Sequence, residues 1–338
     1  MRWDSVRGQD AAVAFLRAAL SSGRLPNAAL LWGPVGVGKR TAGRTLAAAA
    51  LCAEGAAGRD EACGSCAHCR EFAAGVHPDY LELQVEDEAR SIKIEDARTL
   101  MREMNMRPAR GVMRVALIAK AERLGEEAQN ALLKSLEEPP GRALWILTSE
   151  EPDRLLGTVR SRASHVRLNR LASDVVAGEL VRAGESDAPT ARRVAALAEG
   201  SVTLARRLNT EEYTAELTFI EASVLPAVGA GVSAGPELAR ALAKHAGAKG
   251  AARKRKAEGG KRSASLEETR RPVLRLLDAL AQTMRRRVKS SANNRTDADF
   301  WARKLQVVLD SDTAIRHNVR PELVLTAAAA RLADAADS

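Results

Sequence analysis

A glycine-rich turn near the start of the chain constrains the fold more than any other segment. The turn follows a short apolar run at 28–32, which predicts a buried strand, and it precedes a helical pattern over about 38–52. Its glycines allow backbone N–H groups to converge on an anion, and the positive end of the following helix adds to that attraction. The spacing Gly-x-x-x-x-Gly-Lys is that of a phosphate-binding loop, and the residues expected to hold phosphate are Gly33, Gly36, Gly38 and Lys39.

The groups that bind Mg²⁺ beside such a loop are altered. Arg40 occupies the position after the lysine, where a Ser or Thr hydroxyl coordinates the metal, and Thr41 lies one residue further, rotated by about 100° around the helix. An apolar strand expected at 113–119 is followed by Lys120, where P-loop ATPases carry acids that bind the metal and orient water. Glu122 is the nearest substitute base, although a solvated surface glutamate is the simpler interpretation. We therefore expect no ATP hydrolysis, and we expect this degenerate loop, Thr41 included, to bind ATP or ADP weakly or not at all.

Strand and helix patterns alternate up to residue 168, and only helical patterns follow. The expected strands are 28–32, 80–85, 113–119, 143–148 and 164–168. Such alternation predicts a parallel sheet with helices on both faces, which binds its ligands at the carboxyl ends of the strands. We expect an α/β P-loop domain at 1–168, a small helical lid at 169–209 and an all-helical domain at 210–338.

Four cysteines lie within 18 residues and form a candidate metal site. Ten, two and two residues separate Cys52, Cys63, Cys66 and Cys69. Four thiolates suit a closed tetrahedral zinc site with a structural role, and an iron–sulfur cluster is the chemical alternative. His68 lies inside this module, at 52–69, and is expected to be a bystander because four thiols already complete the coordination.

The positive charge of the chain is concentrated in one region. Residues 244–289 carry 15 Lys and Arg against four acids, although the net charge of the whole chain is only +9. Within this region, the Gly-, Ala-, Lys- and Arg-rich segment at about 247–265 is expected to be flexible. Two interpretations remain open for it, contact with DNA phosphates and a solvated loop between domains. No aromatic residue is interleaved in the segment, so base stacking is not indicated there.

Cellular location is constrained by what the sequence lacks. No uncharged apolar run approaches the roughly 20 residues that cross a bilayer, and the first residues have no apolar region typical of a secretory signal. Clustered thiols without a disulfide framework are typical of a reducing compartment. We expect a cytoplasmic protein that does not bind membranes.

Several motifs, in this order, resemble those of the bacterial DNA polymerase III clamp-loader subunits of the AAA+ class. The segment at 130–140, NALLKSLEEPP, is close to the signature helix of that family. The tripeptide at 161–163 resembles its Ser-Arg-Cys motif, with Ala163 in place of the cysteine. Trp3, the Gly-Gln pair at 8–9 and the phosphate loop resemble its N-terminal block. The resemblance covers about residues 1–210 and implies an AAA+ domain, a helical lid and a helical collar that mediates assembly.

Within this class, the altered ATPase elements resemble those of the delta-prime subunits. The motor subunits, gamma and tau, keep an intact metal-binding hydroxyl, an acidic pair and a lid arginine, where this chain has Arg40, Lys120 and Thr203. The resemblance implies an ATPase-inactive stator, a non-catalytic subunit of the polymerase III holoenzyme. It would assemble with gamma/tau and delta to load the sliding clamp onto primed DNA.

The same resemblance gives Arg162 a role as an arginine finger that acts in trans on the nucleotide of a neighbouring subunit. Such a finger stabilises the charge of the transition state. Arg160 is the competing candidate, and a surface ion pair within the domain is the simpler interpretation of Arg162. Two other functions remain open: an active AAA+ ATPase of the gamma/tau type, and a nucleic-acid-binding module built on the cysteines and the basic segment.

Overall fold

The computed structural model describes residues 1–54, 60–84, 91–110, 113–137, 141–230, 234–256, 266–317 and 319–334. Its contacts divide the chain into two compact units, Met1–Arg182 with Ala198–Leu204, and Ala183–Leu197 with Ala205–Ser338. The expected lid at 169–209 is thus shared between the two units, and its boundaries stay a prediction. Residue 85 of the second expected strand, residues 138–140 of the signature segment and residues 257–265 of the basic segment lie outside the described residues.

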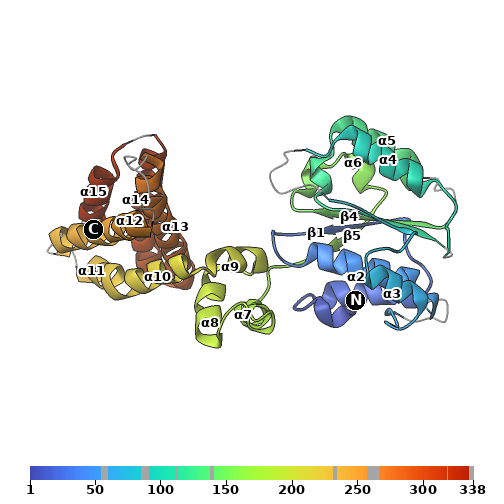
Figure 1. Cartoon of the computed structure of the whole chain (residues 1–338), viewed down its shortest axis with the longest axis horizontal. Coiled ribbons are helices and arrows are strands. Elements are labelled where there is room, and N and C mark those ends of the chain that lie inside the picture. The colour runs from blue at the N-terminus through green and yellow to red at the C-terminus, as the bar shows by residue number, and fades with distance from the viewer. Residues whose placement is uncertain are drawn as a thin grey trace. The chain divides into compact units, whose positions relative to one another are not determined.

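Five parallel strands form the sheet of the first unit, in the order β2-β3-β4-β1-β5 (Figure 1). They are β1 (Ala28–Trp32), β2 (Tyr80–Leu83), β3 (Arg114–Ile118), β4 (Ala143–Ser149) and β5 (Ser164–Arg167). The predicted parallel sheet is therefore confirmed. Because β4 and β5 flank β1, the phosphate loop that follows β1 opens between the carboxyl ends of these two neighbours.

Helices cover both faces of this sheet (Figure 1). One face packs against α1 (Asp10–Ser21), α2 (Lys39–Leu51) and α3 (Ala67–Ala73). The other face packs against α4 (Ile94–Met104), α5 (Glu126–Glu137) and α6 (Gly157–Arg160). The short helices η1 (Trp3–Ser5), η3 (Ala121–Arg123) and η4 (Pro152–Arg154) and the helix α7 (Ser173–Arg182) complete the unit.

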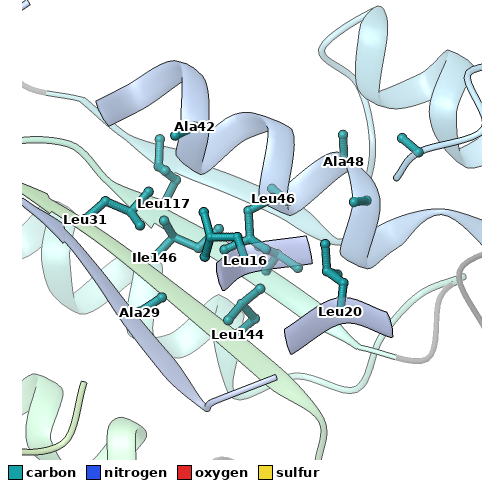
Figure 2. Packing of buried hydrophobic residues seen from close by; sticks show 14 of the residues in the cluster. Leu16, Leu20, Ala29, Leu31, Ala42, Leu46, Ala48, Leu117, Leu144 and Ile146 are labelled. Atoms are coloured by element: carbon teal, nitrogen blue, oxygen red, sulfur yellow. The ribbon is translucent and has the colours of Figure 1, made fainter. Parts of the chain in front are cut away.

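The sheet is hydrophobic on both sides because both sides are covered. Leu31, Leu117 and Ile146 point to the first face, where Leu16 and Leu46 pack against them (Figure 2). The next residue along each strand points to the opposite face and joins a second core. Central strands of this kind are continuous apolar runs, which is why they were predictable from the sequence.

The second unit is all-helical in the residues described, as predicted. It contains α8 (Ala188–Leu197), the end of α9 (Val202–Leu208), α10 (Glu211–Phe219), the π-helical η5 (Ile220–Val224), α11 (Leu225–Ala230), α12 (Gly235–Lys256), α13 (Leu266–Ser290), α14 (Arg295–Arg316) and α15 (Pro321–Ala333). The helix α13 packs along α14, and α12 packs along α15. Fully buried side chains at their contacts include Leu277, Met284, Val308, Ile315 and Leu332.

The basic segment differs from its expected flexibility in its first half. The helix α12 continues to Lys256, so residues 247–256 are helical. Alanine, lysine and arginine are strong helix formers, and here they outweigh the cost of two glycines. None of the helices in the described ranges combines the length and the apolar composition that a bilayer crossing requires.

A buried carboxylate supports the packing of the second unit. Glu216 of α10 is fully buried, and its Oε2 lies 2.6 Å from Nε2 of His245 on α12. The imidazole of His245 also stacks on Phe219, with 3.9 Å between the ring centroids. The pair therefore joins α10 to α12 by both a polar and an aromatic contact.

Replacing His245 with alanine is expected to destabilise the second unit by about 3 kcal/mol, because the buried carboxylate of Glu216 loses a charged hydrogen-bond partner. Urea unfolding of the full chain, followed by circular dichroism, measures the change. The matched control is His317→Ala, because that histidine is exposed in the same unit and should change stability by less than about 0.5 kcal/mol. Equal stability of the two variants would show that the buried pair contributes nothing.

Candidate functional site

The phosphate loop connects β1 to α2 and requires glycine at its turns. Gly36 and Gly38 have φ angles of 72° and 94°, in the left-handed region that favours glycine. A side chain at position 36 would also collide with Ser201, since a Cβ atom there would lie 2.2 Å from its Oγ. The carbonyl oxygen of Gly36 accepts a hydrogen bond from the N–H of Val202 at 2.9 Å. The start of α9 therefore packs directly on the loop.

The lysine of the loop is turned inward onto the loop itself. The Nζ atom of Lys39 donates to the carbonyl oxygens of Gly33 at 2.8 Å and Pro34 at 2.6 Å, and the side chain is almost fully buried. Glu150 lies 4.0 Å from the same Nζ atom. Burial lowers the pKa of Lys39, and the neighbouring carboxylates of Glu150 and Glu122 oppose that shift. The Lys39 ammonium, which would bind the outer phosphates of a nucleotide, is thus hydrogen-bonded to the loop backbone in this structure.

Glu150 was not singled out from the sequence. It follows β4, which lies beside β1 in the sheet, so its position next to the phosphate loop depends on strand order. The sequence predicted that both strands have their carboxyl ends on the same side of a parallel sheet. It did not predict that β4 is the neighbour of β1, so Glu150 could not be placed beside the phosphate loop.

The two residues after the lysine leave no hydroxyl ligand for Mg²⁺ at the usual position. The Nε atom of Arg40 donates to Glu82 of β2 at 2.5 Å, and the hydroxyl of Tyr80 donates to the other carboxylate oxygen at 2.8 Å. Arg40 is therefore engaged by the end of β2. The hydroxyl of Thr41 has no hydrogen-bond partner among the residues described.

The segment after β3 carries no exposed carboxylate aimed at a metal. Lys120 has a φ of 56°, and its N–H donates to the hydroxyl of Thr148 at 3.1 Å. One carboxylate oxygen of Glu122 accepts the N–H of Glu150 at 3.3 Å, and the other is buried without a partner in the described part of the chain. Glu122 is thus a half-buried residue that holds the turn after β4. The interpretation of Glu122 as a solvated surface glutamate is therefore wrong.

Arg162 lies between α6 and β5 and forms an ion pair within its own unit. Its Nε atom donates to Oε1 of Glu137, at the end of α5, at 2.6 Å, and its Nη1 atom donates to the carbonyl oxygen of Thr158 at 2.9 Å. Arg160 pairs with Asp153 instead. The ion pair matches the simpler interpretation of Arg162, and the action in trans stays a prediction.

The position of Arg162 in the sheet bears on where it could act. Arg162 precedes β5, whereas the phosphate loop follows β1, and these two strands are parallel neighbours with Ala29 opposite Ser164. Arg162 therefore lies at the amino ends of the strands, and the phosphate loop lies at their carboxyl ends. Arg162 cannot reach a nucleotide on its own loop without a rearrangement of the sheet.

The four cysteines converge at the end of α2. All four Sγ atoms lie within 4.8 Å of one another, and the pairs Cys52–Cys66 and Cys63–Cys69 are separated by 4.0 and 3.9 Å. Tetrahedral zinc with Zn–S distances of about 2.3 Å would place its sulfurs about 3.8 Å apart. The arrangement therefore fits a four-thiolate metal site.

The surroundings of the cysteines also suit thiolate ligands. Backbone N–H groups of Ser65 and Cys66 donate to Cys63 and lower the pKa of its thiol to about 6. Burial raises the pKa of Cys69 to about 12, so that a cation is needed to keep this thiol ionised in place. The Nδ1 atom of His68 lies 2.9 Å from Nε2 of His77, outside the sulfur cluster. His68 therefore contacts His77 and not the sulfurs, and its role as a bystander stays a prediction.

Comparison with known proteins supports the resemblance seen in the motifs. The chain is 43% identical over 136 residues to DNA polymerase III subunit delta' of Pseudomonas aeruginosa, a match that covers 40% of this chain and 41% of that protein. It is 36% identical over 175 residues to DNA polymerase III subunit tau of Escherichia coli, covering 52% of this chain and 26% of that protein. The chain thus spans less than half the length of these relatives.

A solved structure from Thermotoga maritima, a DNA polymerase III gamma subunit-related protein, matches with a TM-score of 0.42 and 19% identity over 95% of this chain and 98% of that chain. Residues 8–172 match the family described as "DNA polymerase III, delta subunit". These residues hold the phosphate loop, the four cysteines and Arg162. This part of the chain is therefore similar to the DNA polymerase III delta subunit family.

Proposed function

We propose that this chain is a delta-prime-type subunit of the DNA polymerase III clamp loader. In this role it hydrolyses no ATP itself and assembles with gamma/tau and delta to load the sliding clamp onto primed DNA in the cytoplasm. Two observations support the proposal: Arg40 stands at the position of the Mg²⁺-binding hydroxyl, and Arg162 precedes β5 whereas the phosphate loop follows the parallel neighbour β1. A subunit built this way can contribute to hydrolysis only at a neighbour's site.

The partners of the altered residues support the proposed absence of hydrolysis. Arg40 replaces the metal-binding hydroxyl and pairs with Glu82. Lys120 brings a positive charge to the position of a metal-binding acid, and Glu122 is engaged by the backbone of Glu150. A triphosphate on this loop would therefore lack both the ion that bridges its phosphates and a base that orients water.

The trans role of Arg162 requires an exchange of partners. Its guanidinium is about one-third exposed, and Glu137 now occupies its Nε atom. A γ-phosphate carries more charge than one carboxylate and matches the fork of guanidinium donors. The neighbour's nucleotide would therefore displace Glu137 when the subunits assemble.

The four cysteines would hold structural zinc in this proposal. The metal would join Cys52, the residue after α2, to the turn and helix that carry the other three thiolates. Since the phosphate loop precedes α2, the site would fix the far end of the same helix. With four thiolates and no open position, the metal would supply no catalysis.

The isolated chain is expected to show no ATP turnover, and Mg²⁺ is expected to change its affinity for ATP by less than about threefold, because no ligand for the metal is in place. Titration of a fluorescent ATP analogue with and without Mg²⁺ measures the affinity, and phosphate release measures turnover. Lys39→Ala is the control for binding at this loop. Turnover that Lys39→Ala abolishes would overturn the proposal and favour an active motor of the gamma/tau type.

Glu137→Gln is expected to preserve the partners' ATP turnover or to raise it by up to about fivefold, because the ion pair that holds Arg162 is a surface pair worth about 1 kcal/mol or less. The assay is ATP hydrolysis by the reconstituted loader. Asp153→Asn is the matched control, since it removes the equivalent ion pair of Arg160. A large loss with Glu137→Gln would mean that Glu137 positions the finger during hydrolysis, which contradicts the proposed exchange.

A further inference from the structure

The hairpin of α13 and α14 carries arginines that have no acidic partner. Arg286 and Arg287 are exposed near the end of α13, and Arg295 and Arg303 are exposed on α14, which packs along it. Within the residues described, none of the four forms an ion pair. Arg316 of α14, by contrast, is paired, and its Nε atom lies 2.7 Å from Asp312. The hairpin therefore presents positive charge that the fold leaves unneutralised.

Few acids face this charge. Residues 285–303 contain six Lys and Arg but only Asp297 and Asp299 as acids. The carboxylate of Asp297 already accepts a hydrogen bond from the side chain of Asn294, the residue that caps α14, at 3.0 Å. The excess charge attracts a polyanion, and counterion release would make that attraction dependent on salt.

An aromatic pair lies beside one of these arginines. Phe300 and Trp301 are partly exposed on α14, with their ring centroids 5.1 Å apart and their planes nearly perpendicular. The guanidinium carbon of Arg287, from α13, lies 5.3 Å from the centroid of the Trp301 ring. These two side chains are 14 positions apart in the sequence, outside the segment at about 247–265, so their proximity was not predicted. Flat cationic and aromatic groups together are the surface on which unpaired bases stack.

We propose that α13 and α14 form a binding site for single-stranded DNA. Arg286, Arg295 and Arg303 contact the phosphates, and a base stacks on the surface made by Arg287 and Trp301. A duplex offers its phosphates but keeps its base faces stacked inside, so the contribution of Trp301 is specific for single strands. The proposal does not rest on the inactive phosphate loop or on the role of Arg162.

The phosphate contacts are tested by the binding of labelled oligo-dT to the full chain, with fluorescence anisotropy at several salt concentrations. The double variant Arg286→Ala, Arg303→Ala removes two phosphate contacts, so the slope of log K against log salt should become shallower by about 1.4. The control is Arg24→Ala with Arg142→Ala, which removes two exposed arginines from the other unit and should leave the slope unchanged. Equal slopes for the two double variants would overturn the site.

The stacking contact is tested with Trp301→Ala, which should weaken oligo-dT binding about tenfold while the salt slope and the binding of a duplex of equal length stay unchanged. Trp301→Phe keeps an aromatic face and should retain most of the affinity, and circular dichroism confirms that both variants fold. Unchanged affinity for oligo-dT in Trp301→Ala, or an equal loss for the duplex, would overturn the proposal. So would the absence of oligo-dT binding at low salt.

Discussion

Replacing Arg162 with alanine is expected to lower ATP hydrolysis at the neighbouring site of the assembled loader by about 10³- to 10⁵-fold, the range measured for arginine fingers supplied in trans. The side chain lies at the sheet edge opposite its own phosphate loop, so the loss must occur at another subunit's nucleotide. Single-turnover hydrolysis is the best measure of this loss. The burst amplitude should fall by the fraction of ATP that is bound at the one affected site. Steady-state turnover would mix that site with unaffected ones.

Three variants separate a finger from a structural arginine. Arg162→Lys should recover little activity, because a lysine ammonium lacks the planar fork that binds phosphate oxygens. Arg160→Ala should leave the burst intact, since that arginine pairs with Asp153. Assembly, followed by gel filtration, should be unchanged in all three variants. A full burst with Arg162→Ala, or an equal loss with Arg160→Ala, would assign the role elsewhere.

The parts of the fold that could be predicted are those encoded in local sequence. The run at 28–32 is apolar at every position and is followed by glycines, so it indicated a buried strand and a turn without knowledge of its neighbours. The cysteine site was predictable for the same reason, since three of its four ligands lie within seven residues. In both cases the residues are close in the sequence, and this nearly determines how close they lie in the folded protein.

The contacts that could not be predicted join segments that are distant in sequence. Glu150 reaches Lys39 because β4 lies beside β1, and Arg162 reaches Glu137 because α6 packs near α5. Strand order and helix packing depend on the whole core, which no single motif contains. Arg40 is a related case, because its partner Glu82 lies 42 positions away on β2.

The helix at 247–256 illustrates a different limit. Its composition of glycine, lysine and arginine is shared by flexible linkers and by solvent-exposed helices, so composition alone favoured the linker. Individual propensities favour the helix, because alanine, lysine and arginine are all good helix formers. Per-residue propensity would have been the better guide here, since α12 enters the segment already formed and needs no new nucleation.

The second large effect is expected at the cysteines, where Cys69→Ser should abolish zinc binding and destabilise the first unit by several kcal/mol. Structural zinc contributes about 10–16 kcal/mol to the folding of small zinc peptides, and only part of that is expected here because Cys69 also packs into the hydrophobic core. Zinc content by mass spectrometry should fall from about one ion per chain to near zero. Urea unfolding gives the loss of stability.

His68→Ala is the matched control for the metal site, because His68 precedes Cys69 in α3 and pairs with His77 and not with the sulfurs. It should keep its zinc and lose little stability. Iron with visible absorption in the wild-type chain would assign the four thiolates to an iron–sulfur cluster instead. Wild-type chain purified without chelator that holds neither metal would refute the metal site altogether. The helix that carries the phosphate loop would then be fixed by packing alone, since Leu46 and Leu51 of α2 are buried in the same core.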